Sequence, residues 1–238
     1  YDDNGEGGIS RSLESFKKLM KHEPDILLPS HGSIITNPKK EIAALSEKFA
    51  RARFAFFSQN SSILEDLDNR EEKGIPTVDL KKEFPQVLHD GFKPPFILLG
   101  SNNNFILIDY AGSSFFGYRE EELKTMLGKH NIVIQNIDFI LVTHYHDDHT
   151  AGIPFLQEKY GLKVYALENI VDILENPTDY RMGCLIDQPI KVDRVLKDGE
   201  ILEWDKYKFK IFHFPGQTEY HMGMFGEING KSVFFTGD

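Results

Sequence analysis

Residues 144–149 read His-Tyr-His-Asp-Asp-His, just after the apolar run Phe-Ile-Leu-Val at 139–142. Such a run is typical of a buried strand, so the polar residues occupy the loop at its end. Two of the histidines alternate with Tyr145, and in an extended chain they face the same side. Four side chains in the loop are of the types that zinc binds at catalytic sites: His144, His146, Asp148 and His149. The pattern therefore favours a metal site over a polar surface loop.

The bulk composition is that of a globular protein. The chain has 238 residues, of which 40% are hydrophobic and 27% charged. The net charge is −10, and no Lys/Arg stripe is visible, so a nucleic-acid substrate is not expected. The lone Cys184 allows no disulfide within the chain and fits a reducing compartment. With no signal peptide and no apolar stretch of about 18 residues, the sequence predicts a cytoplasmic protein without a membrane span.

The rest of the chain alternates between short helical and extended patterns. Helices are expected at 10–21, 38–57, 120–127, 152–160 and 168–174, and strands at 25–29, 96–99, 105–108, 139–142, 163–166, 207–214, 222–225 and 232–235. The region between Ser58 and Pro95 is polar, is broken by Gly and Pro, and is expected to be a connector with at most one short strand. This mixture, with hairpin-like links, predicts two sheets covered by helices on the outside.

Several short motifs together resemble the metallo-β-lactamase-fold hydrolases. Residues 144–149 match the His-x-His-x-Asp-His signature of that family. Residues 215–221 (Pro-Gly-Gln-Thr-Glu-Tyr-His) resemble its Pro-Gly-His-Thr-x-x-His stretch, with Gln217 in place of the first His. Residues 235–238 resemble its Phe-Thr-Gly-Asp stretch, and residues 29–32 its Pro-x-His-Gly element. The resemblance covers about 200 of the 238 residues and is specific mainly through the first motif.

The resemblance implies a fold and a set of ligands. The fold would be α+β, an αββα sandwich of two mixed β-sheets flanked by helices. One metal would be held by His144, His146 and His221. A second would be held by Asp148, His149 and His31, with Asp238 between the two ions. Asp109 stands where the family carries an acid that supports the ligands.

The resemblance also implies a reaction. Two Zn²⁺ ions per chain would supply a hydroxide that attacks a small ester, thioester, lactone or amide, with Asp148 orienting the water. Iron or manganese are alternatives, because His and carboxylate suit all three metals. A persulfide dioxygenase with a single iron shares the first motif, and a non-catalytic protein that keeps the fold is a third possibility. The partner expected is a small-molecule substrate, and the oligomeric state is left open.

Two residues near the motifs have open roles. Tyr145 is a candidate hydrogen-bond donor to substrate and equally a candidate for packing beneath the loop. Arg181, in a stretch from 176 to 190 that varies around the pocket in the family, is a candidate for binding a substrate carboxylate, with a surface role as the alternative.

The order of the motifs departs from the family in one respect. The Pro-x-His-Gly element follows the Gly-Asp element in the family, whereas here His31 comes early and Asp238 comes last. Joining Asp238 to Tyr1 restores the family order. The hypothesis is therefore a single domain over 1–238 that is either circularly permuted or a rearranged fragment of a repeated protein. Residues 96–238 would be the family's N-terminal part, residues 1–57 its C-terminal part, and 58–95 the connector between them.

Overall fold

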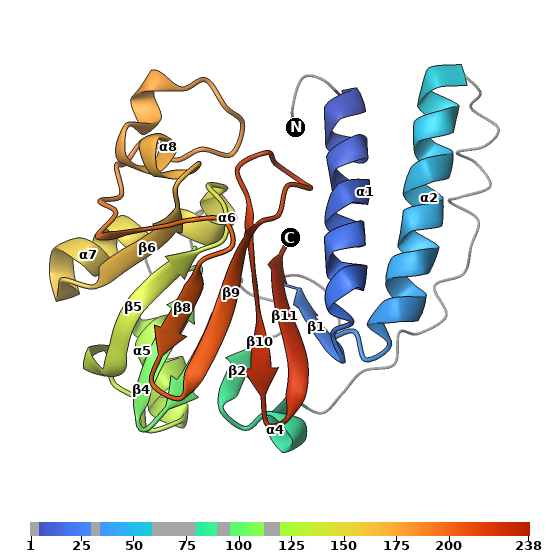
Figure 1. Ribbon diagram of the computed structural model, residues 1–238. Helices are drawn as coiled ribbons and strands as arrows, with labels where there is room; N and C mark the ends of the chain where they lie inside the picture. The colour runs from blue at the N-terminus through green and yellow to red at the C-terminus, as the bar shows by residue number, and fades with distance from the viewer. Residues whose placement is uncertain (1–4, 30–33, 59–79, 90–95, 112–119) are drawn as a thin grey trace.

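The computed structural model describes residues 5–29, 34–58, 80–89, 96–111 and 120–238. These residues form two mixed β-sheets with helices on the outside (Figure 1). The αββα arrangement expected from the sequence is therefore confirmed. His31 lies outside the described residues.

One sheet has five strands in the order β1-β11-β10-β9-β8. Its strands are β1 (Ile26–Pro29), β8 (Ile201–Trp204), β9 (Tyr207–His213), β10 (Met222–Ile228) and β11 (Lys231–Gly237). The strands from β8 to β11 are antiparallel neighbours, but β1 runs parallel to β11, with Leu27 opposite Phe234 and Pro29 opposite Gly237. Segments from the two ends of the sequence thus share one sheet edge.

The other sheet has six strands in the order β2-β3-β4-β5-β6-β7. Its strands are β2 (Val87–His89), β3 (Ile97–Ser101), β4 (Asn104–Ile108), β5 (Ile137–Val142), β6 (Lys163–Leu167) and β7 (Arg194–Leu196). The strands from β4 to β7 are parallel, and the β3–β4 hairpin is antiparallel as expected. Four of the six side chains of β5 are consecutive, apolar and buried, which is typical of a strand covered on both faces.

Helices flank the sandwich on both sides. They are α1 (Gly5–His22), α2 (Pro38–Ser58), α4 (Leu80–Glu83), α5 (Glu120–Lys129), α6 (Asp147–Thr150), α7 (Ile153–Tyr160) and α8 (Val171–Glu175), with 3-10 turns η2 (Ile134–Asn136) and η3 (Pro177–Asp179). In Figure 1, α1 and α2 stand beside β1 and β11, and α7 and α8 lie on the opposite side of the molecule. Asn37 starts α2 by accepting a hydrogen bond from the Lys40 amide at 3.4 Å, and Gly161 ends α7 in the left-handed conformation.

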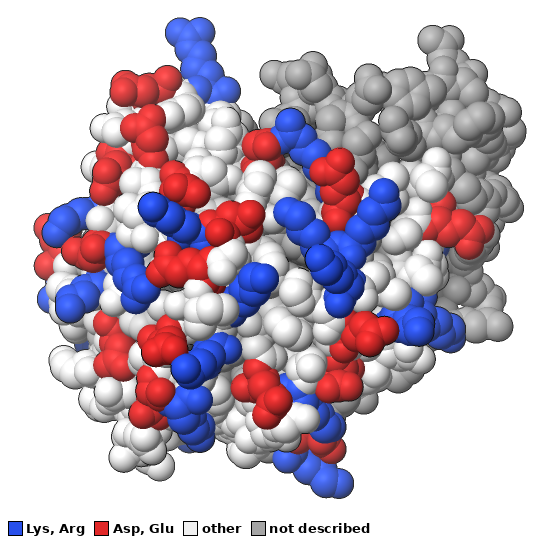
Figure 2. Space-filling view, viewed as in Figure 1, with Lys and Arg blue, Asp and Glu red and all other residues white. Residues whose placement is uncertain are grey.

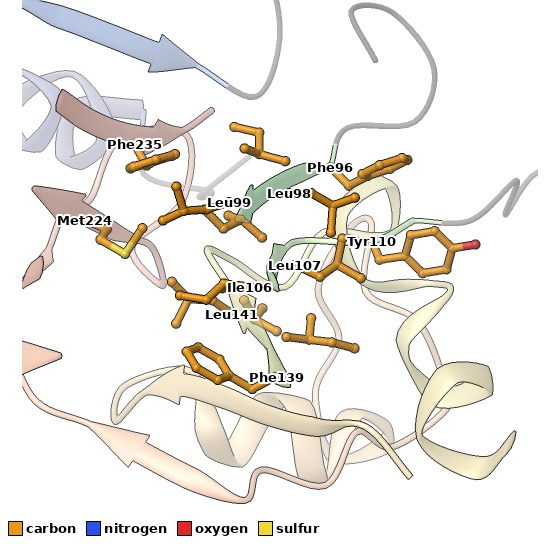
Figure 3. Close-up of a cluster of buried hydrophobic side chains, with 14 of the residues drawn as sticks. Phe96, Leu98, Leu99, Ile106, Leu107, Tyr110, Phe139, Leu141, Met224 and Phe235 are labelled. Carbon is orange, nitrogen blue, oxygen red and sulfur yellow. The ribbon is translucent and has the colours of Figure 1, made fainter. Parts of the chain in front are cut away.

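The main core lies between the two sheets. In Figure 3, Met224 and Phe235 of the five-stranded sheet face Leu99 and Ile106 of the six-stranded sheet. Each fully buried side chain of this kind contributes roughly 1.5–3 kcal/mol relative to exposure. A smaller cluster joins α1 and α2 to the outer face of the five-stranded sheet: Leu19, Leu27, Ile42, Phe212, Phe214 and Phe234. This second cluster fixes where α1 can lie.

Most expected elements form close to their expected bounds. Helix α4 and the 3-10 turns η2 and η3 were not expected, and there are three further differences. Helix α5 continues through Gly128 to Lys129, because one glycine weakens a helix without ending it. Strands β7 and β8 were not expected, since both are short edge strands with exposed Val195 and Ile201. The ligand loop contains the short helix α6 where only a turn was expected.

The surface carries charges of both signs. On the face seen in Figure 2, acidic and basic side chains are interspersed. Among the described helices, none has the length and apolar character needed to cross a membrane.

Candidate metal centre

The loop after β5 is held at its backbone on two sides. His144 forms an isolated antiparallel bridge with His221, and the Met222 amide donates to the Thr143 carbonyl at 2.8 Å. His146 forms a similar bridge with Leu185. The ends of β5 and β11 and the start of β10 therefore meet at the upper edge of the sandwich in Figure 1. Ligand side chains at the carboxyl end of a parallel strand are typical of α/β binding sites.

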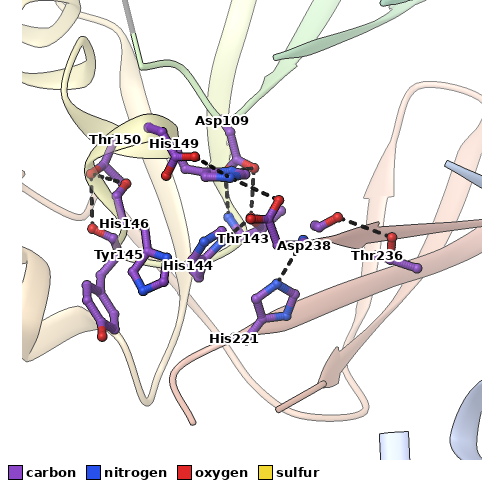
Figure 4. Close-up of polar contacts among 12 residues, drawn as sticks. Asp109, Thr143, His144, Tyr145, His146, His149, Thr150, His221, Thr236 and Asp238 are labelled. Atoms are coloured by element: carbon purple, nitrogen blue, oxygen red, sulfur yellow. Dashed lines mark hydrogen bonds and ion pairs between the residues drawn. The ribbon is translucent and has the colours of Figure 1, made fainter. Parts of the chain in front are cut away.

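The histidines and carboxylates of the loop converge with Asp238 (Figure 4). Potential ligand atoms lie within 4.8 Å of one another in two groups, which share His144. One group contains His146 and Asp148, and the other contains His149 and Asp238. The Nε2 atom of His149 lies 3.1 Å from the Asp238 carboxylate and 3.8 Å from that of Asp148. Five of the seven ligands expected from the sequence thus share one small region.

His221 lies beside this cluster without belonging to either group. Its ring is fully buried, with its centroid 4.9 Å from that of His144, and its Nε2 accepts the Asp238 amide at 3.3 Å. The family resemblance implies that His221 joins His144 and His146, and in the structure Asp148 also lies within reach of that pair. The division of ligands between two metals stays a prediction, as does the part of His31.

Asp109 orients two of the histidines through hydrogen bonds, His149 directly and His144 through Thr143. This carboxylate is 1% exposed and accepts hydrogen bonds from the Thr143 amide and hydroxyl, each at 2.7 Å, and from His149 Nδ1 at 2.8 Å. The Thr143 hydroxyl proton is thereby used, so the hydroxyl oxygen accepts from His144 Nδ1 at 3.0 Å. Both imidazoles then turn Nε2 toward the centre, as metal-ligating histidines do. The family resemblance predicted a supporting role for Asp109, but nothing in the sequence predicted that Thr143 would link Asp109 to His144.

Burial and charge set the protonation of the metal-free cluster. Burial works against a proton on His149, but the carboxylates of Asp109 and Asp238 outweigh it and raise the pKa of His149 to about 10. Burial and the positive charge of His149 lower the pKa of His221 to about 3. Burial also lowers the pKa of His146. A cation that takes His149 as a ligand must therefore displace its proton.

The donor atoms fit a divalent metal ion. Within the described part of the chain, His146 Nε2 and His221 Nδ1 are buried and have no hydrogen-bond partner. A buried polar atom without a partner costs free energy, and a bound cation would remove that cost. Imidazole nitrogen and carboxylate oxygen are ligands of zinc and equally of iron and manganese.

Gln217 occupies the position where the motif departs from the family. Its side-chain amide donates to the Asp238 carboxylate at 2.9 Å. The substitution thus leaves a hydrogen-bond donor on the carboxylate expected between two metals, a contact that the sequence did not predict.

Tyr145 and Arg181, whose roles the sequence left open, lie in different environments. Tyr145 is only 4% exposed, and its ring packs edge-on against His146 at a centroid distance of 4.8 Å, so it packs within the loop. Arg181 is exposed. The segment that contains it is joined to the ligand loop, because the Asp147 amide donates to the Cys184 carbonyl at 2.7 Å.

Replacing Gly237 with alanine is expected to disturb the centre directly. Gly237 has φ +64°, and an added Cβ would stand 2.5 Å from His221 Nε2 and 3.1 Å from Thr143 Cβ. Strain and overpacking of this kind cost about 1–3 kcal/mol. Urea denaturation of the metal-free variant should show this loss. Gly183→Ala is the control, because an added Cβ there meets nothing within 4 Å. Equal midpoints for the two variants would contradict the argument.

The chain is similar to known proteins in sequence and in fold. The sequence profile described as the Metallo-beta-lactamase superfamily matches residues 90–238. A hydroxyacylglutathione hydrolase of Pelagibacter ubique is 29% identical over 140 residues, which are 59% of this chain and 52% of that protein. An exodeoxyribonuclease of Streptococcus pneumoniae is 30% identical over 89 residues, 36% of this chain and 33% of that protein.

Among solved structures, the subclass B3 metallo-beta-lactamase of Bradyrhizobium japonicum superposes with a TM-score of 0.54 at 22% identity. The match covers 63% of this chain and 59% of that one. At this identity the likeness concerns the fold. The chain spans about half or less of the length of the curated relatives it matches.

Proposed function

Because this chain belongs to the metallo-beta-lactamase superfamily, we propose that it is a metal-dependent hydrolase of small ester or thioester substrates. The observation that carries the proposal is the convergence of buried imidazoles and carboxylates in two overlapping groups of ligand atoms. A hydrolase that relies on bound metal needs this kind of centre and no serine or cysteine nucleophile.

Seven residues would hold two Zn²⁺ ions: His144, His146, His221, Asp148, His149, His31 and Asp238. When bound, such ions supply a nucleophilic water near neutral pH and polarise a carbonyl group. Asp109 and Thr143 fix the tautomers of His149 and His144. The side chain of Asp148 is 42% exposed, the most accessible carboxylate of the cluster, and it is the group proposed to orient the attacking water and hold its proton.

Two relatives bear on the substrate class. A hydroxyacylglutathione is a thioester, and the relative named for it matches 59% of this chain. The exodeoxyribonuclease matches 36% of it. A net charge of −10 works against binding a polyanion, so the ester and thioester class is preferred to DNA.

The arrangement of strands supports the permuted order of motifs. Parallel neighbours in a sheet need a crossover connection, which is usually a helix. Strand β11 ends just before Asp238, α1 begins at Gly5, and β1 runs parallel to β11. Read in family order, β11-α1-β1 forms one such crossover. We propose on this basis that 1–57 completes the domain of 96–238, and that His31 joins the centre from the end of β1, where Pro29 lies opposite Gly237.

Metal analysis combined with a substrate panel tests the proposed function. We expect two zinc ions per chain and hydrolysis of acyl thioesters or esters that chelation abolishes and added zinc restores. One iron per chain with oxygen consumption on a persulfide would instead identify a dioxygenase. A full metal complement with no turnover on esters, thioesters, lactones and amides would indicate a non-catalytic family member. Degradation of single-stranded DNA alone would show the substrate class to be wrong.

A further inference from the structure

Helix α1 contacts the loop that leads to His221. This loop, residues 214–221, joins β9 to β10 and is called the His221 loop below. The ammonium group of Lys18 donates to the carbonyl of His213 at 2.7 Å, and the hydroxyl of Ser15 donates to the carbonyl of Pro215. Ser12 lies next to the same segment, 3.8 Å from where a Cβ on Gly216 would stand. Because these three side chains are spaced three residues apart, they lie on one face of the helix.

The His221 loop is already closed on itself. The Phe214 amide donates to the His221 carbonyl at 2.9 Å, and the Gly216 amide donates to the Thr218 carbonyl at 3.1 Å. At its base, His213 Nε2 donates to the Glu219 carbonyl at 2.8 Å. These bonds fix the shape of the loop but not its place relative to β11, which carries the residues leading to Asp238. The loop is also joined to His144 by the bridge at His221 and to Asp238 by Gln217, and the contacts with α1 add anchors from a helix outside the sheet.

The loop brings two groups to the metal centre. It ends in His221, whose ring is fully buried, and it carries Gln217, which donates to the Asp238 carboxylate. A shift of the loop would therefore move one imidazole and one carboxylate contact together. Metal sites require their ligands to be held within about 0.5 Å, and residues that orient the ligands determine this.

Packing of α1 does not require these polar contacts. Leu19 packs in the cluster with Phe212, Phe214 and Phe234, and Phe16 and Met20 pack against that cluster. Ser15, however, is only 2% exposed, and the bond made by Lys18 is partly buried. Placing a hydroxyl and an ammonium group there costs desolvation that apolar side chains would avoid. Their hydrogen bonds to the carbonyls of His213, the last residue of β9, and of Pro215, in the His221 loop, call for another explanation.

We propose that α1 is a clamp for the metal centre, in which Lys18 and Ser15 are positioning residues that hold the His221 loop in the geometry needed for metal binding. The inference rests on the proposed metal centre but needs no particular substrate. The clamp comes from a segment remote in the sequence, since the two hydrogen bonds join residues that are 195 and 200 positions apart.

Lys18→Met is the decisive variant, since methionine keeps an unbranched stem and loses the charged donor. We expect zinc affinity, measured by competition with a chromophoric chelator, to fall about 10-fold. The visible spectrum of the cobalt-substituted protein should change, and kcat should fall more than KM rises. Lys17→Met is the matched control, because Lys17 is the exposed neighbour on the same helix and should leave all three values unchanged. Lys18→Arg keeps a donor and should restore most of the affinity.

A wild-type zinc affinity and cobalt spectrum for Lys18→Met would overturn the clamp, even if its melting temperature fell. If the Lys18→Met variant does not fold, the same measurements are made on Ser15→Ala. A lowered zinc affinity of that variant would support the clamp, and a wild-type affinity would overturn it. Failure of the proposed function is distinguishable: a wild-type protein that hydrolyses no substrate, yet loses zinc affinity on Lys18→Met, would leave the clamp standing. Normal hydrolysis with unchanged affinity in both variants would remove the clamp alone.

Discussion

Replacing His146 with alanine should remove at least one metal ion and nearly all activity. His146 is 6% exposed, belongs to the ligand group with His144 and Asp148, and has a buried Nε2 without a hydrogen-bond partner in the described part of the chain. Loss of one of the few protein ligands leaves a coordination position that water fills without fixing the geometry. We expect kcat/KM to fall by roughly 10³-fold or more.

The fold should survive this change. The backbone of the loop is held independently, by the bridge between residues 146 and 185 and by the Thr150 hydroxyl, which donates to the His146 carbonyl at 2.9 Å. Metal content is measured by inductively coupled plasma spectrometry beside the kinetics. His130→Ala is the control, because His130 is an exposed histidine at the end of α5. Undiminished activity in the His146 variant would refute the mechanism.

Replacing Asp109 with alanine should give the largest loss of stability. The change leaves the Thr143 amide and hydroxyl and His149 Nδ1 without their shared acceptor. Breaking a buried ion pair by removing one partner costs about 3–5 kcal/mol. The backbone adds to the cost, because Asp109 has φ +57°, a conformation that Asp and Asn tolerate better than Ala. Urea denaturation of the metal-free protein measures the free energy of unfolding.

Asp109→Asn separates the two causes. Asparagine keeps the backbone tolerance and an acceptor for the Thr143 amide but removes the charge beside His149. We expect a smaller loss of stability than for alanine, together with a pKa of His149 shifted down toward its ordinary value, followed by NMR titration. Exposed Asp187→Asn serves as the surface control. If alanine at position 109 changed the unfolding free energy by no more than this control, the supporting role of Asp109 would be wrong.

Local patterns were sufficient where one stretch of sequence contains all the information. The apolar run before His144 predicts β5, and the alternation of Tyr207, Phe209 and Ile211 predicts β9, since each side chain faces one side of its own strand. Strand β7 escaped such reasoning because it has three residues and only Leu196 is buried. Three residues are too few to show the alternation of apolar and polar side chains that identifies a strand.

The sequence by itself determined the family and the sandwich fold, and it predicted a set of ligand side chains, because motifs of a few adjacent residues and the alternation of helical and extended patterns carry this information. Only the tertiary structure decided that β1 pairs with β11, that Thr143 links Asp109 to His144, and that Gln217 reaches Asp238. The physical reason is that hydrogen bonds between side chains depend on distances of about 3 Å. Such distances between remote residues arise only when both sheets and α1 have packed together.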